Sequence, residues 1–170
     1  EAEWMGVFHA SAVNYNDENI LILGDSGNGK STSLALLQAQ GFQCIADDFV
    51  PIDQAQNVYS FPAGISIKKK AVSVLLKEYP TLETSAEYHY ERLNKTVRYL
   101  PPQQIDYHKK APCKALVFIK YDATIDFEIS KMSKLKAFEH LVPDSWISSS
   151  PKNAASFLDW FEKMPCYQLT

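Results

Sequence analysis

A glycine-rich segment near the start of the chain has the residue types and spacing of a phosphate-binding loop. Residues 24–31 read G-D-S-G-N-G-K-S and match G-x-x-x-x-G-K-[ST] in full. Glycines let backbone N–H groups approach phosphate oxygens closely, while the lysine suits the β- and γ-phosphates and the serine hydroxyl suits Mg²⁺. We therefore expect a nucleoside triphosphate and Mg²⁺ at this loop. The expected binding residues are Gly24, Asp25, Ser26, Gly27, Asn28, Gly29, Lys30, Ser31 and Thr32.

The residues on either side of this segment have the patterns that such a loop needs. Residues 20–23 are entirely apolar, which is typical of a buried strand. Residues 32–40 predict a helix that stops at Gly41, and its N-terminus would add a positive dipole end beside a bound phosphate. A simple glycine turn with a surface lysine would not require this combination, so we favour the phosphate-binding interpretation.

Two adjacent carboxylates, Asp47 and Asp48, follow the next predicted strand, residues 42–46. One carboxylate at such a position could hold Mg²⁺, and the other could take a proton from an attacking hydroxyl. The alternative is a solvated acidic turn. A buried strand would deliver the pair to a ligand-binding edge of the sheet, which favours the functional interpretation.

Three further basic groups are candidates with a structural alternative. His9 lies within a predicted strand, residues 6–15, and a hairpin with residues 20–23 would bring it beside the loop, although a lone histidine is more often structural. Arg98 fits a phosphate contact and a surface position equally well. The lysine run 68–70 is either a solvated face or a lining for the triphosphate.

The rest of the chain predicts further strands and helices without a repeat or linker. After the aspartates we expect a hairpin of residues 49–52 and 58–61, an irregular or edge strand over 61–67 and a helix over 68–79. A loop over 81–93 and a strand over 96–100 should follow, and then a central strand over 113–119 paired with 124–129. The last elements are a helix capped by Ser133, a helix starting at Ser150-Pro151 and a strand over 166–169.

Apolar residues at helical spacing predict which faces of the last two helices are buried. The core-facing residues are expected to be Leu135, Phe138 and Leu141 on the first helix, and Ala154, Phe157, Leu158 and Phe161 on the second, with Trp160 at the rim.

Length and composition indicate one globular domain over residues 1–170. Apolar residues make up 46% and charged residues 22%, and the net charge of −3 gives no general attraction to nucleic acid or to an anionic membrane. No apolar run is long enough to span a bilayer. The three cysteines, Cys44, Cys113 and Cys166, are expected to be buried thiols in a cytoplasmic protein. The first residue is Glu rather than Met, so we expect that an upstream segment is missing, and residues 166–169 are either a last strand or the start of a segment that continues beyond Thr170.

Taken together, these motifs resemble the catalytic domain of HPr kinase/phosphorylase, a bacterial family related to nucleotide-dependent phosphoenolpyruvate carboxykinases. The family pattern is H-G-V-L-V, then G-D-S-G-x-G-K-S, a helix ending in Gly and a strand ending in A-D-D. The counterparts here are residues 9–13, 24–31, 41 and 46–48, which cover the first third of the chain. The resemblance implies an α/β fold of the phosphoenolpyruvate-carboxykinase-like P-loop type, a single domain with a mixed β-sheet and flanking helices.

The resemblance also implies roles in ATP-dependent phosphoryl transfer to a serine or threonine hydroxyl. Lys30 would bind phosphate, and Ser31 and Asp47 would lie at the Mg²⁺. Asp48 would accept the proton of the hydroxyl, with His9 close to the transferred group. The acceptor is left open as a hydroxyl-bearing protein, peptide or small molecule, and a homo-oligomer is compatible with the sequence.

The sequence departs from the family pattern in two places. The family has a metal-binding glutamate where residues 65–71 here read I-S-I-K-K-K-A. Its C-terminal segment with an essential arginine has no counterpart, and Arg98 is the candidate substitute. A non-catalytic sensor that binds ATP or ADP is therefore the alternative function, whereas His9 and the aspartate pair favour the enzyme.

Overall fold

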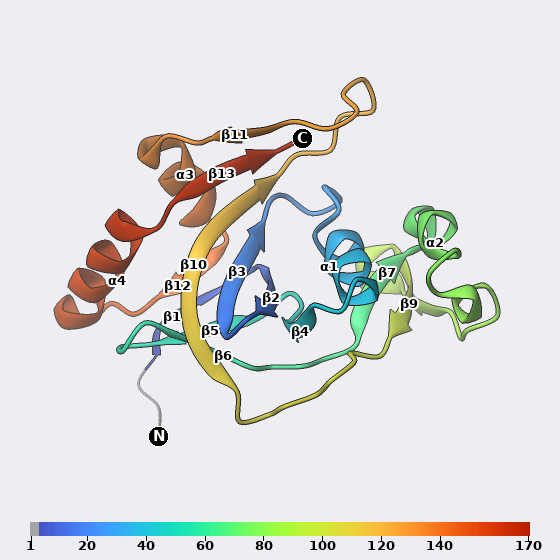
Figure 1. Ribbon diagram of the computed structural model, residues 1–170, viewed down its shortest axis with the longest axis horizontal. Helices are drawn as coiled ribbons and strands as arrows, with labels where there is room; N and C mark the ends of the chain where they lie inside the picture. The colour runs from blue at the N-terminus through green and yellow to red at the C-terminus, as the bar shows by residue number, and fades with distance from the viewer. Residues whose placement is uncertain (1–3) are drawn as a thin grey trace.

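The computed structural model describes residues 4–170 as a mixed α/β fold with two β-sheets (Figure 1). Within these residues the larger sheet has ten strands in the order β12-β1-β5-β6-β10-β3-β2-β4, with β13 added to β10 and β11 added to β13. The strands of the larger sheet are β1 (Trp4–Phe8), β2 (Ser11–Tyr15), β3 (Glu18–Leu23), β4 (Gln43–Ala46), β5 (Val50–Asp53), β6 (Asn57–Tyr59), β10 (Lys110–Ile119), β11 (Ile129–Lys131), β12 (Ser145–Ile147) and β13 (Cys166–Leu169).

The smaller sheet lies beside the first helix and has the strand order β7-β9-β8. Its strands are β7 (Ile65–Lys68), β8 (Tyr88–Tyr90) and β9 (Lys95–Leu100). The helices are α1 (Lys30–Ala39), α2 (Lys69–Leu75), α3 (Lys134–Leu141) and α4 (Pro151–Lys163), with short 3₁₀ turns at Pro80–Glu83 and Glu91–Leu93.

The side chains of β3 pack against a different core on each face of the sheet. Leu21 and Leu23 belong to the core that includes the aromatic residues of α4, whereas Ile22 belongs to a second core that includes Leu34 of α1. Successive strand residues point to opposite faces, so a strand with helices on both sides must be apolar throughout. The apolar run 20–23 is therefore the signature of a central strand, and it ends where the glycine-rich loop begins.

The parallel part of the larger sheet determines where its strand ends meet. Strands β3 and β13 both pair parallel with β10, at Leu116–Leu21 and Leu116–Cys166 among other positions. The carboxyl ends of the three strands therefore lie at the same edge of the sheet, which is where open α/β sheets bind ligands. The predicted hairpin between residues 6–15 and 20–23 is present as β2–β3, but β3 already begins at Glu18, which pairs with Tyr15, so the turn is shorter than the expected residues 16–19.

Most predicted elements are present, and four predictions are wrong. The segment 6–15 is two strands, and His9 lies in the bend between β1 and β2 rather than within a strand. Residues 124–129 do not pair with β10; its partners are β3, β6 and β13, and β11 pairs with β13 instead. The helix predicted over 68–79 ends at Leu75. The segment predicted to be a loop, 81–93, contains β8 and two 3₁₀ turns.

The buried faces of the C-terminal helices also differ from the prediction. Ser133 caps α3 by accepting a hydrogen bond from the Lys136 N–H, as expected, but Leu135 is 72% exposed. On α4, Leu158 is 53% exposed and Trp160 is buried. The Trp160 ring packs against Phe8 of β1, with centroids 5.5 Å apart. The helix is thus rotated relative to the predicted stripe, because its aromatic side faces the sheet.

Candidate functional site

The glycine-rich loop connects β3 to α1 in the predicted order. Gly24, Gly27 and Gly29 have φ angles of 140°, 102° and 97°, a region that side chains with a Cβ rarely adopt. A Cβ on Gly24 would also lie 2.5 Å from the carbonyl oxygen of Ile119 on the neighbouring strand β10. The loop therefore requires glycine at its first position for close packing as well as for its backbone conformation.

The backbone of the loop holds the Lys30 side chain in place. Its Nζ donates a 2.6 Å hydrogen bond to the Gly24 carbonyl oxygen, and the residue is 6% exposed. Burial lowers the pKa of the Lys30 ammonium, while the nearby carboxylates of Asp48, Asp144 and Asp47 raise it. An anionic ligand at the loop would give this partly desolvated cation a directly bound counter-charge.

Asp47 lies beneath the loop and accepts three hydrogen bonds. Its Oδ1 accepts from the hydroxyls of Ser11 at 2.7 Å and Ser31 at 3.0 Å, and its Oδ2 accepts from the Ser66 N–H at 3.1 Å. Burial raises the pKa of the Asp47 carboxyl, although the hydrogen bonds oppose this shift. The predicted pair of metal-site residues, Ser31 and Asp47, is thus brought together.

Asp48 points into the space above the loop and meets His9. The His9 Nε2 lies 3.4 Å from the Asp48 Oδ1, and the two side chains are 42% and 48% exposed. Asp48 has a φ of 67°, a left-handed conformation that only a few non-glycine residues adopt. The two neighbouring aspartates therefore have different surroundings. The Asp47 side chain is buried beside the loop, whereas the Asp48 side chain lines a cavity.

A cavity of about 1000 Å³ joins these groups. One side is formed by the loop with Lys30, Ser31 and Thr32, and another by His9 and Asp48. The lysine run 68–70 lines the remaining side together with residues 93–96, and the Lys68 Nζ donates a 3.0 Å hydrogen bond to the Ser26 hydroxyl. The lysine run therefore lies on the cavity, although Lys69 and Lys70 are also exposed to solvent, so its role as a lining for a triphosphate stays a prediction.

Arg98 is not among the residues that line this cavity. Its guanidinium donates hydrogen bonds to the backbone carbonyls of Leu82, Glu83 and Ser85, one of them short. These bonds hold the end of the first 3₁₀ turn and the residues just after it against β9. The structure therefore places Arg98 in a structural role and does not bring it to the loop.

Asp25 and Asn28 face away from the large cavity. With Gly24 they line a second, smaller cavity on the other side of the loop. The predicted binding residues are therefore divided between two cavities, and the loop is the wall that separates them.

Sequence reasoning missed three residues that shape the site. Ser11 is completely buried and Ser66 supplies a backbone donor, and both bind Asp47. Asp144, from the turn before β12, accepts the His9 N–H with its backbone carbonyl and acts on the charge of Lys30. A serine inside an apolar strand was a signal for the first of these, whereas Ser66 and Asp144 reach the site only through tertiary contacts.

The side-chain oxygens beside the loop are of the kind that bind Mg²⁺. Among residues 4–170, no group of three or more His, Cys, Asp or Glu side chains is arranged to hold a metal ion. Mg²⁺ in nucleotide sites is usually held by one or two protein oxygens, substrate phosphates and water. The Ser31 hydroxyl and the Asp47 carboxylate, 3.0 Å apart, provide oxygens of this kind.

Comparisons with known proteins give little beyond this geometry. No protein-family profile matches the sequence, and no curated protein matches it. The solved structure of the Hpr(Ser) kinase/phosphatase from Coxiella burnetii is similar over 96% of this chain and 83% of its own, with 11% sequence identity and a TM-score of 0.34. A similarity at this level carries no functional argument. In the part of the chain that the structure describes, no helix is long and apolar enough to cross a membrane.

Proposed function

We propose that this protein is an ATP-dependent kinase that transfers the γ-phosphoryl group to a serine or threonine hydroxyl of a protein, peptide or small molecule. The observation that carries the proposal is that Lys30, Ser31 and the His9–Asp48 pair line one cavity beside the glycine-rich loop, with the buried Asp47 carboxylate 3.0 Å behind the Ser31 hydroxyl. Phosphoryl transfer requires positioning and charge neutralisation of this kind more than covalent catalysis by the protein.

The roles of the residues follow from their positions. The triphosphate would lie on the backbone N–H groups of the loop, with Lys30 exchanging its bond to the Gly24 carbonyl for phosphate oxygens. Ser31 and Asp47 would hold Mg²⁺, which neutralises phosphate charge when bound. Lys68 reaches the loop at Ser26 and adds a second cation on the open side.

Asp48 would accept the proton of the acceptor hydroxyl. As that O–H bond breaks, the oxygen bonds to the γ-phosphorus, and the bond from the γ-phosphorus to the bridging oxygen breaks to release ADP. Asp48 is exposed enough to meet an incoming hydroxyl, and His9 at 3.4 Å can orient its carboxylate and pass the proton to solvent.

The proposal is tested by transfer of labelled phosphate from [γ-³²P]ATP to a library of serine- and threonine-containing peptides and hydroxy acids. Asp48→Asn should retain ATP binding and lose transfer by about 10²- to 10⁴-fold, the usual contribution of a general base. Asp144→Asn is the matched control, because Asp144 also acts on Lys30 but does not line the cavity. Normal transfer by Asp48→Asn would remove Asp48 from this role.

One observation favours the second candidate, a nucleotide sensor. The Ser26–Lys68 hydrogen bond connects the loop directly to the end of β7 and the start of α2. A phosphate bound at the loop would compete for Lys68 and could thus move the smaller sheet. Slow ATP hydrolysis without any phosphorylated product, together with an ATP-dependent change in protease cleavage near residues 68–95, would indicate the sensor.

A further inference from the structure

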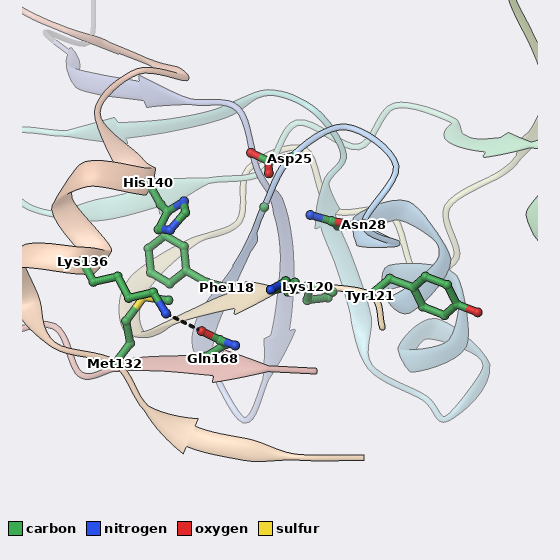
Figure 2. A pocket seen from close by; sticks show the side chains of 11 residues that line it. Asp25, Asn28, Phe118, Lys120, Tyr121, Met132, Lys136, His140 and Gln168 are labelled. Atoms are coloured by element: carbon green, nitrogen blue, oxygen red, sulfur yellow. Dashed lines mark hydrogen bonds between the residues drawn. The ribbon is translucent and has the colours of Figure 1, made fainter. Parts of the chain in front are cut away.

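The cavity on the other side of the loop is a compact space of about 320 Å³ (Figure 2). It lies at the edge of the sheet where β3, β10 and β13 all end, and α3 forms its outer wall. Figure 2 shows His140 of α3 and Asn28 of the loop on opposite sides of this space. Ligands of open α/β sheets bind at the carboxyl ends of parallel strands, so the position itself is typical of a binding site.

The lining combines an apolar floor with polar edges. Phe118 and Met132 form the apolar part, and the imidazole of His140 lies against the Phe118 ring with centroids 6.2 Å apart. At the rim, the Lys136 Nζ donates a 2.9 Å hydrogen bond to the Gln168 Oε1. Small-molecule sites typically have this composition, with mostly apolar and aromatic surfaces and a few polar groups that fix the orientation of the ligand.

Neighbouring residues of one loop line both cavities. Gly24, Asp25 and Asn28 face the smaller cavity, whereas Gly27 and Lys30 face the larger one. A nucleotide with its phosphates on this loop would place its reactive end beside His9 and Asp48. Beyond the loop the larger cavity is lined mainly by lysines and other polar residues, whereas the smaller cavity offers an apolar and aromatic surface for the base and sugar.

We propose that the cavity formed by Phe118, Met132, Lys136, His140 and Gln168 beside Gly24–Asn28 binds the base and sugar of the nucleotide. This inference rests on the proposed function, because it takes the loop as the phosphate site. A volume of about 320 Å³ suffices for a base and part of its sugar, at the lower end of the range for small-molecule pockets. The hydroxyl acceptor is excluded from this cavity, since Asp48 lines only the other one.

Calorimetry with two probes separates the base from the phosphates: MgATP, and inorganic tripolyphosphate with Mg²⁺, which lacks base and sugar. His140→Ala and Gln168→Ala should each weaken MgATP binding about fivefold or more, as expected for losing contacts to a stacked base, and leave tripolyphosphate affinity within about twofold. Glu139→Ala is the matched control, because Glu139 is an exposed neighbour on α3 outside the cavity. Circular dichroism and thermal unfolding establish that each variant is folded.

The outcomes distinguish this inference from the proposed function. If both cavity variants bind MgATP as the wild type does while Lys30→Ala loses both probes, the base lies elsewhere and only this inference is overturned. Equal weakening of both probes by the cavity variants would also overturn it, because the effect would then act on the phosphates. A wild-type protein that binds neither probe would overturn the proposed function and this inference together.

Discussion

The His9 imidazole lies 3.4 Å from the Asp48 carboxylate, although the two residues follow different strands, β1 and β4. His9 sits in the bend before β2, and Asp48 follows β4, which pairs with β2. The pairing of β2 with β4 therefore brings His9 and Asp48 together, next to the partly buried Ser31–Asp47 pair. Each pair leads to a separate prediction.

Replacing His9 should affect transfer but not nucleotide binding. In our account His9 orients Asp48 and relays its proton, so His9→Ala should lower the transfer rate by about 10- to 100-fold, at the low end of acid–base contributions. His9→Gln can still hydrogen-bond Asp48 and should lose less. Single-turnover transfer and calorimetry measure the two quantities. A loss of MgATP affinity equal to the loss of rate would contradict this role.

Replacing Lys30 should weaken the binding of every triphosphate. Hydrogen bonds to charged groups contribute about 1.5–3 kcal/mol, so Lys30→Met should reduce MgATP affinity by about 10- to 100-fold. Calorimetry measures this affinity, and Lys77→Met, an exposed change on another segment, is the control. An unchanged affinity would contradict the assignment of Lys30.

The same variant makes a prediction about the pH dependence of stability without ligand. The Lys30 pKa is lowered in the folded protein, so between that value and 10.5 the unfolded chain binds more protons. The free energy of unfolding of the wild type should therefore rise relative to Lys30→Met as the pH increases through this window. Urea unfolding at several pH values tests the sign, and a relative fall would contradict it.

Asp47 should tolerate asparagine better than alanine. Asparagine can still accept from the Ser66 N–H and donate to the hydroxyls of Ser11 and Ser31, whereas Asp47→Ala leaves the buried Ser11 hydroxyl without its acceptor. We expect a loss of about 1–3 kcal/mol of unfolding free energy for alanine and less for asparagine. Both variants should lose Mg²⁺-dependent nucleotide affinity. Equal stability of the two variants in urea would contradict the hydrogen-bonding account.

Burial also gives Asp47 a pH signature. Its pKa is raised from 3.8 in the folded state, so above 3.8 the native protein binds more protons than the unfolded chain does. The wild type should lose stability relative to Asp47→Asn as the pH rises from 3.8 through the folded pKa. Urea unfolding from about pH 3.5 to about pH 7 measures the difference in unfolding free energy between the wild type and Asp47→Asn. A rise in the stability of the wild type relative to the variant would contradict the sign.

Two of the three thiols should be unreactive in the folded protein. Burial raises the pKa of Cys44 and of Cys113 to about 12, so little thiolate exists at neutral pH. Labelling with a disulfide reagent near pH 8, about half a unit below the usual thiol pKa, should be slow before unfolding and complete after it. Fast labelling of either residue in the native state would contradict their burial.

Local motifs allowed the loop and the elements on either side of it to be predicted from the sequence. The loop needs glycines at fixed positions, and the flanking strand and helix carry their own patterns, so residues 20–40 were predicted nearly as found. Ser31 and Asp47, both expected at a metal site, lie 3.0 Å apart, and His9 lines the same cavity as the loop, as the hairpin hypothesis expected. These groups lie in one compact part of the sheet, β2–β3–β4, with short connections.

Long-range pairing explains what could not be predicted. The choice of β13 rather than residues 124–129 as a partner of β10 depends on the helix α4 that precedes it, and no local pattern records that choice. The second cavity likewise combines residues 24–28 with residues 118–168, which share no motif. On α4, stripes through Leu158 and through Trp160 both have helical spacing, and packing against Phe8 decides between them.

The central claim is that a nucleoside triphosphate lies on the loop with its last phosphate between Lys30 and Asp48. A crystal structure with Mg²⁺ and a non-hydrolysable ATP analogue measures this most directly. We predict the γ-phosphate within hydrogen-bonding distance of the Lys30 Nζ, the metal at Ser31 and Asp47, and Asp48 facing the phosphorus. An analogue bound away from the loop, or with its γ-phosphate turned away from Asp48, would contradict the account.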